Sequence, residues 1–256
     1  MSVTDFFGKK VVITGAGGGL GRALVAVFRE HGGAVTACDQ SLAAMDGLDA
    51  QTKQCFDLTD LASVGEIAAA ITSETGVPDV VINNAGWTRA ETMASLTPES
   101  IYQEIQLNLT GVMTFTSLLL DGMKKRGSGS IVFISSINSL LHFGNPAYSA
   151  AKAGVNAYAR AIAVEYGAYG IRANAVCPGS IRTPAWDHRL NRDPGIPEKL
   201  EKLYPLRRMV ECDEVAEAAA FLASERASGI TGICMPVDAG LTAGNRHFID
   251  DVLGGA

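Results

Sequence analysis

Short apolar runs alternate with longer amphipathic segments along almost the whole chain. The runs are rich in β-branched residues and predict strands, whereas the longer segments have the apolar spacing of helices. Near-continuous apolar strands are typical of a sheet buried on both faces, and their alternation with helices requires crossovers between parallel strands. The sequence therefore predicts a parallel α/β fold with strands in 9–15, 34–39, 53–58, 79–86, 129–136, 171–179 and 232–238 and helices in 20–31, 60–74, 98–125, 147–168 and 213–223.

No linker or break in composition divides the 256 residues, so we expect one domain spanning 1–256. The segment 184–212 differs from the rest, because it contains four prolines and has little strand character. Long irregular insertions in compact domains are commonly lids or binding elements. We expect this segment to be a substrate lid.

Composition excludes several classes of function. The net charge of −6 leaves no basic stripe for tracking phosphates, so we expect no nucleic-acid partner. The compact basic run 124–126 is expected to be a solvated helix end. No segment reaches the length of about 18 apolar residues that a membrane span needs, and the N-terminus has no apolar leader. We therefore expect a cytoplasmic chain without membrane contact.

Cysteine and histidine usage argues against a metal. The five cysteines form an odd set without a C-x-x-C pair, and we expect them to be reduced core residues. The four histidines are scattered and contain no H-E-x-x-H pattern. We predict no metal site among Cys38, Cys55, Cys177, Cys212, Cys234, His31, His142, His188 and His247.

The stretch VVITGAGGGLGRALVAVFREHG places a glycine-rich turn between the first predicted strand and the first predicted helix. Glycine lets the backbone approach phosphate groups, and a helix N-terminus offers free N–H groups with a positive dipole end. The pattern differs from G-x-G-x-x-G, so a merely flexible turn stays open as the alternative. We expect a dinucleotide pyrophosphate at Gly15, Gly18, Gly19, Leu20 and Gly21.

Asp39 ends the second predicted strand, about twenty residues after the glycine turn. A carboxylate there can accept hydrogen bonds from both ribose hydroxyls and would repel a 2′-phosphate. No Lys or Arg lies within 15–21 or 38–41 to attract that phosphate. The sequence therefore favours NAD over NADP. Asp57, after the third strand, could reach the adenine amino group, or it could simply lead the next helix.

Tyr148 and Lys152, in the stretch AYSAAKAG, are four residues apart and project from one face of a predicted helix. A free tyrosine has a pKa of about 10, and a pKa near 7 would need about 4 kcal/mol of preference for the phenolate. The Lys152 ammonium, together with the nicotinium ring of NAD⁺, would favour the phenolate. The pair therefore predicts a proton acceptor, which in the reverse direction is a proton donor.

In combination, these motifs resemble the short-chain dehydrogenase/reductase family over nearly the whole chain. The matching stretches are TGAGGGLG at 14–21, NNAG at 83–86, LNLTG around Asn108, ISS at 134–136, YSAAK at 148–152, PGSIRTP at 178–184, and ITG and VDAG near the C-terminus. The resemblance implies a single-domain, doubly wound Rossmann-type sheet of seven parallel strands with helices on both faces. It also implies hydride transfer between a secondary alcohol and a ketone, and a homotetramer.

The same resemblance assigns catalytic roles to Asn108, Ser136, Tyr148 and Lys152. It implies that Ser136 holds the substrate oxygen, that Asn108 holds a water beside Lys152, and that Lys152 also binds the nicotinamide ribose. Ser135 is the rival of Ser136, because adjacent strand residues face opposite ways and only one can point into the site. Further implied cofactor contacts are Asp57, Leu58, Asn84, Ala85, Gly86, Pro178, Gly179, Ile181 and Thr183, the last two at the nicotinamide carboxamide.

The side chains expected around the substrate are polar and cationic. Arginine pairs with carboxylates, and the lid and C-terminus look like those of sugar or deoxy-sugar-acid dehydrogenases. We therefore expect a sugar or a 2-keto-3-deoxy sugar acid as substrate. The expected substrate residues are Trp87, Arg89, Ser136, Asn138, His142, Asn145, Arg182, Trp186, His188 and Arg189.

Alternatives remain open at this point. A 3-oxoacyl-thioester reductase or a hydroxysteroid dehydrogenase would share the core. An acyl-carrier-protein ketoreductase, however, would be expected to favour NADP and to present a basic patch, where this chain has Tyr169. A non-catalytic NAD-binding sensor is an alternative of another class. The C-terminal residues 246–256 could cover a neighbouring subunit's site or fray.

Overall fold

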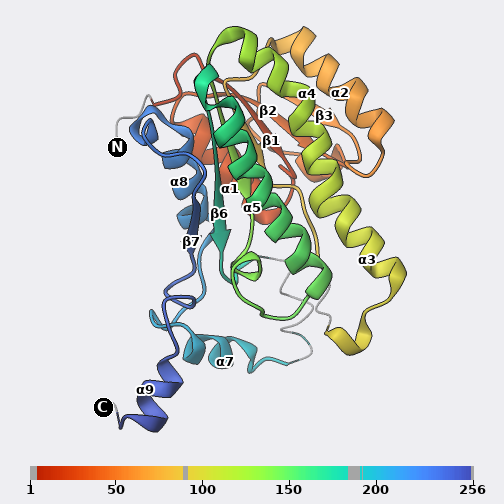
Figure 1. Cartoon of the computed structure of the whole chain (residues 1–256). Coiled ribbons are helices and arrows are strands. Elements are labelled where there is room, and N and C mark those ends of the chain that lie inside the picture. Colours follow the sequence, from red (N-terminus) through yellow and green to blue (C-terminus); the bar gives the residue numbers. More distant parts are fainter. Residues whose placement is uncertain (1–4, 89–91, 184–190, 192, 255–256) are drawn as a thin grey trace.

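A seven-stranded parallel β-sheet forms the centre of the molecule (Figure 1). The structure is a computed structural model that describes residues 5–88, 92–183, 191 and 193–254. The strand order β3-β2-β1-β4-β5-β6-β7, with every pairing parallel, confirms the predicted doubly wound sheet. The strands are β1 Lys10–Thr14, β2 Ala34–Asp39, β3 Thr52–Cys55, β4 Val80–Asn83, β5 Gly129–Ile134, β6 Ile171–Pro178 and β7 Cys234–Val237.

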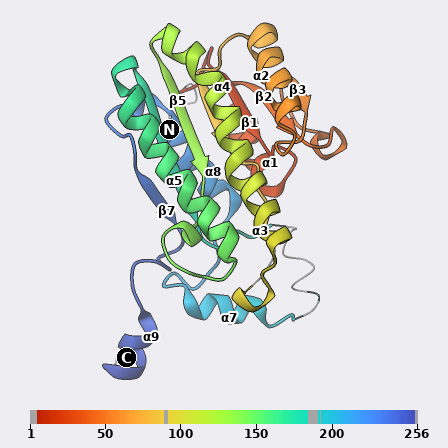
Figure 2. The same cartoon turned by 45° about the vertical axis from the view of Figure 1, so that its right-hand side comes forward.

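Helices cover both faces of the sheet, as predicted (Figures 1 and 2). On one face, Leu24 and Phe28 of α1 share a core with Val215 of α8. On the other, Phe115 of α4 and Val155 of α5 share a core with α2. The longer helices are α1 Gly19–Glu30, α2 Leu61–Thr75, α3 Pro98–Ile105, α4 Gly111–Arg126, α5 Pro146–Tyr166, α7 Ile196–Leu203, α8 Cys212–Ala223 and α9 Arg246–Val252. Single 3₁₀ turns are η1 Ala43–Met45, η2 Met93–Ser95, η4 Ile137–Ser139, η5 Gly167–Tyr169 and η7 Glu225–Ala227.

The edge strands are less buried than the sequence predicted. The central strands β4 and β5 are buried over nearly their whole length, whereas β3 alternates half-buried and exposed residues and β7 is mostly half-buried. An edge strand has a neighbour on one side only, so less of its surface is covered. The prediction of strands buried on both faces is right for the centre of the sheet and wrong for its edges.

The predicted helix 98–125 contains a π-helical turn that the apolar spacing did not indicate. α3 ends at Ile105, residues Gln106–Thr110 form the π turn, and α4 begins at Gly111. The side-chain amide of Asn108 donates to the backbone carbonyl of Glu104 at 3.0 Å, which is the acceptor that the N–H of residue 108 uses in an α-helix. π turns inside α-helices often mark functional sites.

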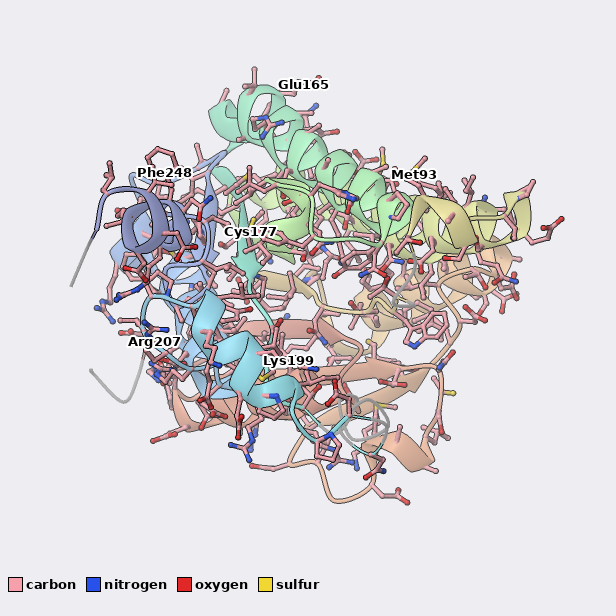
Figure 3. All side chains as sticks on the ribbon, turned by 90° about the horizontal axis from the view of Figure 1, so that it is seen from below. Met93, Glu165, Cys177, Lys199, Arg207 and Phe248 are labelled. Carbon is pink, nitrogen blue, oxygen red and sulfur yellow. The ribbon has the colours of Figure 1, made fainter. Side chains whose placement is uncertain are left out.

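α7 lies on the side of the sheet where the strands end (Figures 1 and 2). Figure 3 views this side, with Lys199 of α7 and Cys177 near the end of β6 labelled. α7 comes from the predicted lid 184–212, of which residues 184–190 and 192 lie outside the described residues. α9 extends away from the sheet (Figure 1). Its side chains Phe248 and Ile249 are exposed.

Among the helices of the described ranges, none combines the length and the apolar character that crossing a membrane requires. Within these ranges, no group of three His, Cys, Asp or Glu side chains is placed to hold a metal ion.

Candidate active site

The loops that follow β1 and β4 pack against each other at the point where the strand order reverses. A Cβ on Gly15 would lie 2.7 Å from the Cα of Ala85, so glycine is needed for this close approach. Thr14 Oγ1 accepts hydrogen bonds from the backbone N–H groups of Asn84 and Ala85, both at 3.1 Å. Asn84 Nδ2 donates to the carbonyls of Thr14 at 3.1 Å and Gly15 at 2.9 Å. The predicted cofactor residue Asn84 therefore braces these two loops. The point where the strand order reverses is where α/β sheets of this type bind ligands.

The glycine turn is open at Gly18 and tightly packed at Gly21. Gly18 is exposed at the N-cap of α1, and the nearest atom to a Cβ there would be the carbonyl oxygen of Gly15 at 3.6 Å. Gly21 is the opposite case, because its Cβ would overlap that same oxygen. Gly19 begins α1 and Leu20 is buried in the core. An open approach at the helix N-terminus, above a tightly packed first turn, fits a phosphate group.

Asp39 stands at the end of β2 beside this turn. Its Oδ2 accepts a hydrogen bond from the Gly17 N–H at 2.9 Å, and the residue stays partly exposed. A carboxylate so placed fits the ribose hydroxyls of a dinucleotide. Arg22, which sequence reasoning overlooked, donates to the backbone carbonyls of Gly17, Ala44 and Asp46. Its guanidinium thereby packs the segment after β2 against the glycine turn.

Asp57 and Leu58 follow β3 on the same side of the sheet. The exposed Asp57 accepts hydrogen bonds from the backbone and hydroxyl of Thr59, both at 2.8 Å, whereas Asp60 is the residue that caps α2. Leu58 is buried, and a Cβ on Gly111 would overlap its carbonyl oxygen. Glycine at the start of α4 therefore allows this helix to approach the loop after β3.

Tyr148, Ser136 and Lys152 come together between the end of β5 and the first turns of α5. The Ser136 hydroxyl, which accepts a hydrogen bond from the Asn138 N–H at 3.2 Å, lies close enough to the Tyr148 phenol to lower its pKa. Ser135 Oγ instead donates to the backbone carbonyl of Lys152 at 3.3 Å. Of the two serines, Ser136 therefore faces the tyrosine. Lys152 Nζ donates to the Ile134 carbonyl at 2.9 Å and lies 5.5 Å from the centre of the Tyr148 ring.

Burial has the largest effect on the pKa values of Tyr148 and Lys152. It raises the pKa of Tyr148 to about 12, because a phenolate would lose its hydration, and the charges of Glu104 and Cys177 add to the rise. The nearby Ser136 hydroxyl acts in the opposite direction and lowers this pKa. Burial also lowers the pKa of Lys152 to about 8. The sequence-based expectation that Lys152 helps to bring the pKa of Tyr148 near 7 is thus not met by the chain's own groups.

Asn108 is fully buried and held in one orientation. Its Oδ1 accepts from the Trp87 N–H at 3.1 Å. Its Nδ2 donates to the Trp87 carbonyl at 2.9 Å and to the Glu104 carbonyl and Oε2, both at 3.0 Å. A Cβ on Gly86 would lie 2.7 Å from Asn108 Oδ1 and 3.2 Å from Lys152 Nζ. Asn108 and Lys152 therefore converge on the same glycine.

The end of β6 and the loop after it carry four of the expected cofactor residues, Pro178, Gly179, Ile181 and Thr183. The last two were expected at the nicotinamide carboxamide. The N–H of Ser180 donates to the hydroxyl of Tyr204 at 2.8 Å, and Tyr204 is completely buried. Ile181 forms a parallel bridge with Val210. Two residues of the predicted lid therefore hold this loop, and sequence reasoning missed the part played by Tyr204.

The segment between Ser136 and Tyr148 holds three of the expected substrate residues. Asn138 Nδ2 donates to the Gly144 carbonyl at 2.9 Å and to Ser149 Oγ at 3.2 Å, so this amide braces the loop against α5. His142 is exposed. Asn145 precedes α5 with a left-handed φ of 49°. Of these three residues, Asn138 has its amide committed to the loop itself.

Two other expected substrate residues are at the surface. Arg182 is exposed, and its backbone N–H donates to the Val210 carbonyl at 2.9 Å. Trp87 has 54 % of its surface exposed. Arg89, Trp186, His188 and Arg189 lie outside the described residues.

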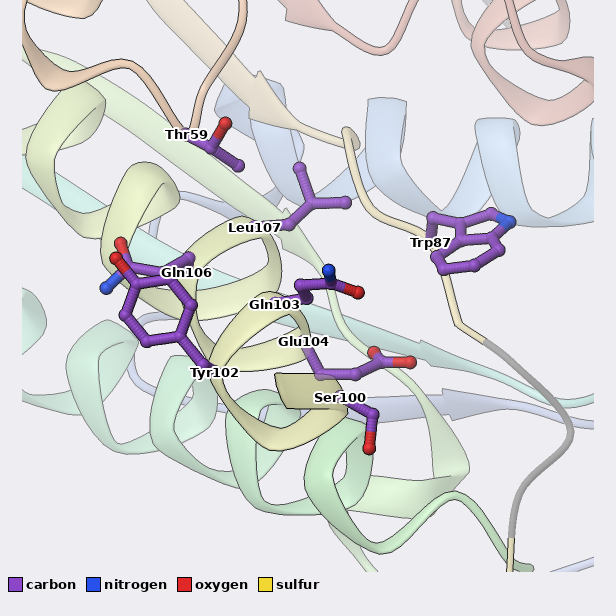
Figure 4. Close-up of a pocket in the computed structure, with 8 residues that line it drawn as sticks. All are labelled: Thr59, Trp87, Ser100, Tyr102, Gln103, Glu104, Gln106 and Leu107. Carbon is purple, nitrogen blue, oxygen red and sulfur yellow. The ribbon is translucent and has the colours of Figure 1, made fainter. Parts of the chain in front are cut away.

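A pocket of about 320 Å³ opens beside α3 (Figure 4). Glu104 lies on its wall with only 6 % of its surface exposed, a burial that sequence reasoning did not anticipate. The signal was available, because Glu104 precedes Asn108 by four residues, the spacing that places two side chains on one helix face. The pocket is lined by Thr59, Trp87, Ser100, Tyr102, Gln103, Glu104, Gln106 and Leu107.

Comparison with known proteins agrees with this geometry. A family model described as enoyl-(acyl carrier protein) reductase matches residues 15–242. The chain belongs to the short-chain dehydrogenase/reductase family. This short-chain dehydrogenase/reductase is 38 % identical over 249 residues to an uncharacterized oxidoreductase of Schizosaccharomyces pombe, covering 96 % of this chain and 95 % of that protein.

Two further comparisons support the family. The 3-oxoacyl-[acyl-carrier-protein] reductase FabG of Thermotoga maritima is 34 % identical over 249 residues, covering 91 % of this chain and 98 % of that protein. The crystal structure of an oxidoreductase of the short-chain dehydrogenase/reductase family from Burkholderia thailandensis has 40 % identity and a TM-score of 0.91, covering 97 % of this chain and 98 % of that one. This short-chain dehydrogenase/reductase is thus an oxidoreductase of a family that uses nicotinamide cofactors.

Proposed function

We propose that this enzyme uses NAD to interconvert a secondary alcohol and a ketone by hydride transfer. The observation that supports the proposal most is the meeting of Ser136, Tyr148 and Lys152, with Asn108 and Lys152 converging on Gly86 in the loop after β4. A nicotinamide cofactor bound there supplies or accepts the hydride. The chain's own residues then have to hold the substrate oxygen, move its proton and exclude water.

Tyr148 is the proton donor in reduction and the acceptor in oxidation. Because burial raises its pKa to about 12, the phenol is protonated at neutral pH and ready to donate to a carbonyl oxygen. The Ser136 hydroxyl, which lies near the phenol, holds that same oxygen. Oxidation needs the phenolate instead, so kcat/KM for the alcohol is expected to rise with pH.

Asp39 supports NAD as the preferred cofactor. Its partly exposed carboxylate, held by the Gly17 N–H, suits ribose hydroxyls and repels a 2′-phosphate. Arg22 is engaged with three backbone carbonyls, so its guanidinium is committed to the fold.

The substrate is a sugar or a 2-keto-3-deoxy sugar acid, and 184–212 is its lid. The polar residues His142 and Asn145 in the segment before Tyr148, and the exposed Arg182 just before the lid, suit hydroxyl groups and a carboxylate better than a long apolar chain. A 3-oxoacyl thioester is the second candidate, because the relative from Thermotoga maritima carries that description.

The enzyme is a single domain that works in the cytoplasm as a homotetramer. Apolar side chains stay exposed on two long neighbouring helices, at Met113 and Leu118 of α4 and at Val164 of α5, which is 83 % exposed. Exposed apolar surface of this kind is typical of a subunit interface.

The test is Tyr148→Phe, assayed with NAD⁺ or NADP⁺ against aldoses, polyols, sugar acids, 2-keto-3-deoxy acids, hydroxysteroids and 3-hydroxyacyl thioesters. Loss of the proton-transfer group should lower kcat by about 10² to 10⁴-fold while NADH binding is retained. Tyr158→Phe is the matched control on the same helix, because its hydroxyl makes only a 3.4 Å contact with the Met113 carbonyl. Full activity of Tyr148→Phe would contradict the assignment, and turnover with NADP⁺ alone would contradict the cofactor.

A further inference from the structure

Glu104 is a buried carboxylate that the proposed chemistry does not use. It lies in the last turn of α3, one helical turn before Asn108, and 6 % of its surface is exposed. Its Oε2 accepts a hydrogen bond from Asn108 Nδ2 at 3.0 Å, and its backbone carbonyl accepts a second one from the same amide. We propose that Glu104 is a positioning residue, which holds the Asn108 amide and supplies a negative charge to the Tyr148–Lys152 pair.

Glu104 is linked to Lys152 through its contact with Asn108. Both hydrogens of the Asn108 amide are engaged by Glu104 and Trp87, so Asn108 Oδ1 is oriented toward the N–H of Trp87 and the space above Gly86. Lys152 Nζ borders that same space. A change at Glu104 therefore reaches Lys152 through one intervening side chain. The inference rests on the proposed function for its catalytic meaning, but the contacts themselves do not depend on it.

The negative charge of Glu104 also acts on Tyr148 and Lys152. An opposite charge nearby favours the ammonium form of Lys152, and a negative charge disfavours the phenolate form of Tyr148, so Glu104 raises the pKa of both groups. Among the described residues, Cys177 of β6 is the other titratable group acting on the pair, and it acts in the same direction. Hydrogen bonding, with Cys234 foremost, lowers the pKa of the Cys177 thiol to about 7. Any test must therefore separate Glu104 from Cys177.

The direct experiment is an NMR titration of the lysine side chains in the full-length protein without substrate, with the Lys152 signal assigned by its loss in Lys152→Gln. The wild-type midpoint should lie near 8. In Glu104→Gln the midpoint should fall by about one pH unit, as expected for one charge several Å away at an effective dielectric constant of about 20. An unchanged midpoint in Glu104→Gln would overturn the proposal.

Two variants control for charge and for Cys177. Glu99→Gln removes the same charge from an exposed position on the same helix, and water and salt should screen its effect to near zero. In a Cys177→Ala background the shift caused by Glu104→Gln should persist. If Glu99→Gln shifts the midpoint as much as Glu104→Gln does, or if the shift disappears with Cys177, the assignment to Glu104 fails.

Glu104→Asp tests positioning separately and covers the case in which Glu104→Gln does not fold. This variant keeps the charge but shortens the reach to Asn108, so the Lys152 midpoint should stay near its wild-type value while kcat falls several-fold. A wild-type kcat in Glu104→Asp would overturn the positioning role. Absence of turnover in the wild type would refute the proposed function, and the NMR titration would still decide the role of Glu104.

Discussion

One added methyl group at Gly86 would test the geometry of the active site. Its Cβ would lie 2.7 Å from Asn108 Oδ1, whereas ordinary contacts begin at 3.4 Å. The same Cβ would lie 3.2 Å from Lys152 Nζ, so it has a second close contact. Asn108 cannot swing away without giving up hydrogen bonds to Trp87 and Glu104.

The cost of Gly86→Ala follows from these contacts. Leaving a buried polar group unpaired costs about 1–3 kcal/mol, so we expect a loss of about 2 kcal/mol in the free energy of unfolding. For a chain of this length that loss lowers Tm by about 4–8 °C. Misplacing the acid–base residues by a fraction of an ångström should lower kcat/KM by about 10- to 100-fold.

The assay combines thermal unfolding, followed by circular dichroism, with steady-state kinetics on the best substrate of the wild type. Gly65→Ala is the matched control, because the space around a Cβ at Gly65 in the middle of α2 is open to 4 Å. It should stabilise the helix by about 0.5–1 kcal/mol and leave activity unchanged. Wild-type Tm and kcat/KM in Gly86→Ala would refute the packing argument, since Asn108 and Lys152 could then not be held against this glycine.

Two further substitutions test the cofactor site and the lid. Asp39→Asn keeps an acceptor for the Gly17 N–H but removes the negative charge. The ratio of kcat/KM for NADP⁺ to kcat/KM for NAD⁺ should therefore rise about tenfold, which is equivalent to about 1.4 kcal/mol. An unchanged ratio would contradict the role of Asp39 in selecting the cofactor. Tyr204→Phe leaves the Ser180 N–H without its acceptor, which should lower the free energy of unfolding by about 1–3 kcal/mol, measured by thermal unfolding. Tyr102→Phe is the control, because this side chain is 66 % exposed and its change should not lower the free energy of unfolding measurably.

Most of the fold could be predicted, because the spacing of apolar residues within each segment indicates whether the segment is a strand or a helix. Each predicted strand and helix has a counterpart in the structure, displaced by a few residues at its ends. The π turn at Asn108 could not be read from apolar spacing, because it accompanies a polar contact between the Asn108 side chain and the Glu104 carbonyl. The weaker burial of β3 and β7 depends on their place at the sheet edges, which a single strand's sequence does not encode.

The candidate site was predicted unevenly for a similar reason. The pairing of Tyr148 with Lys152 depends on spacing within one helix, and the structure keeps it. Asn84 was predicted to contact the cofactor. The sequence did not indicate that its side-chain amide bonds to Thr14 and Gly15, about seventy residues earlier in the chain. Such long-range partners exist only once β1 and β4 lie side by side.

The sequence by itself determined which chemical groups lie at each strand end, because side-chain spacing within a strand or helix is a local property. It determined the glycine turn, the carboxylate after β2 and the phenol–ammonium pair of α5. Only the tertiary structure decided how those groups are protonated and what holds them. Burial raises the pKa of Tyr148 and lowers that of Lys152, and the charge of Glu104 reaches both from another helix. Desolvation and charge–charge interaction depend on distances in space, which the order of residues along the chain does not contain.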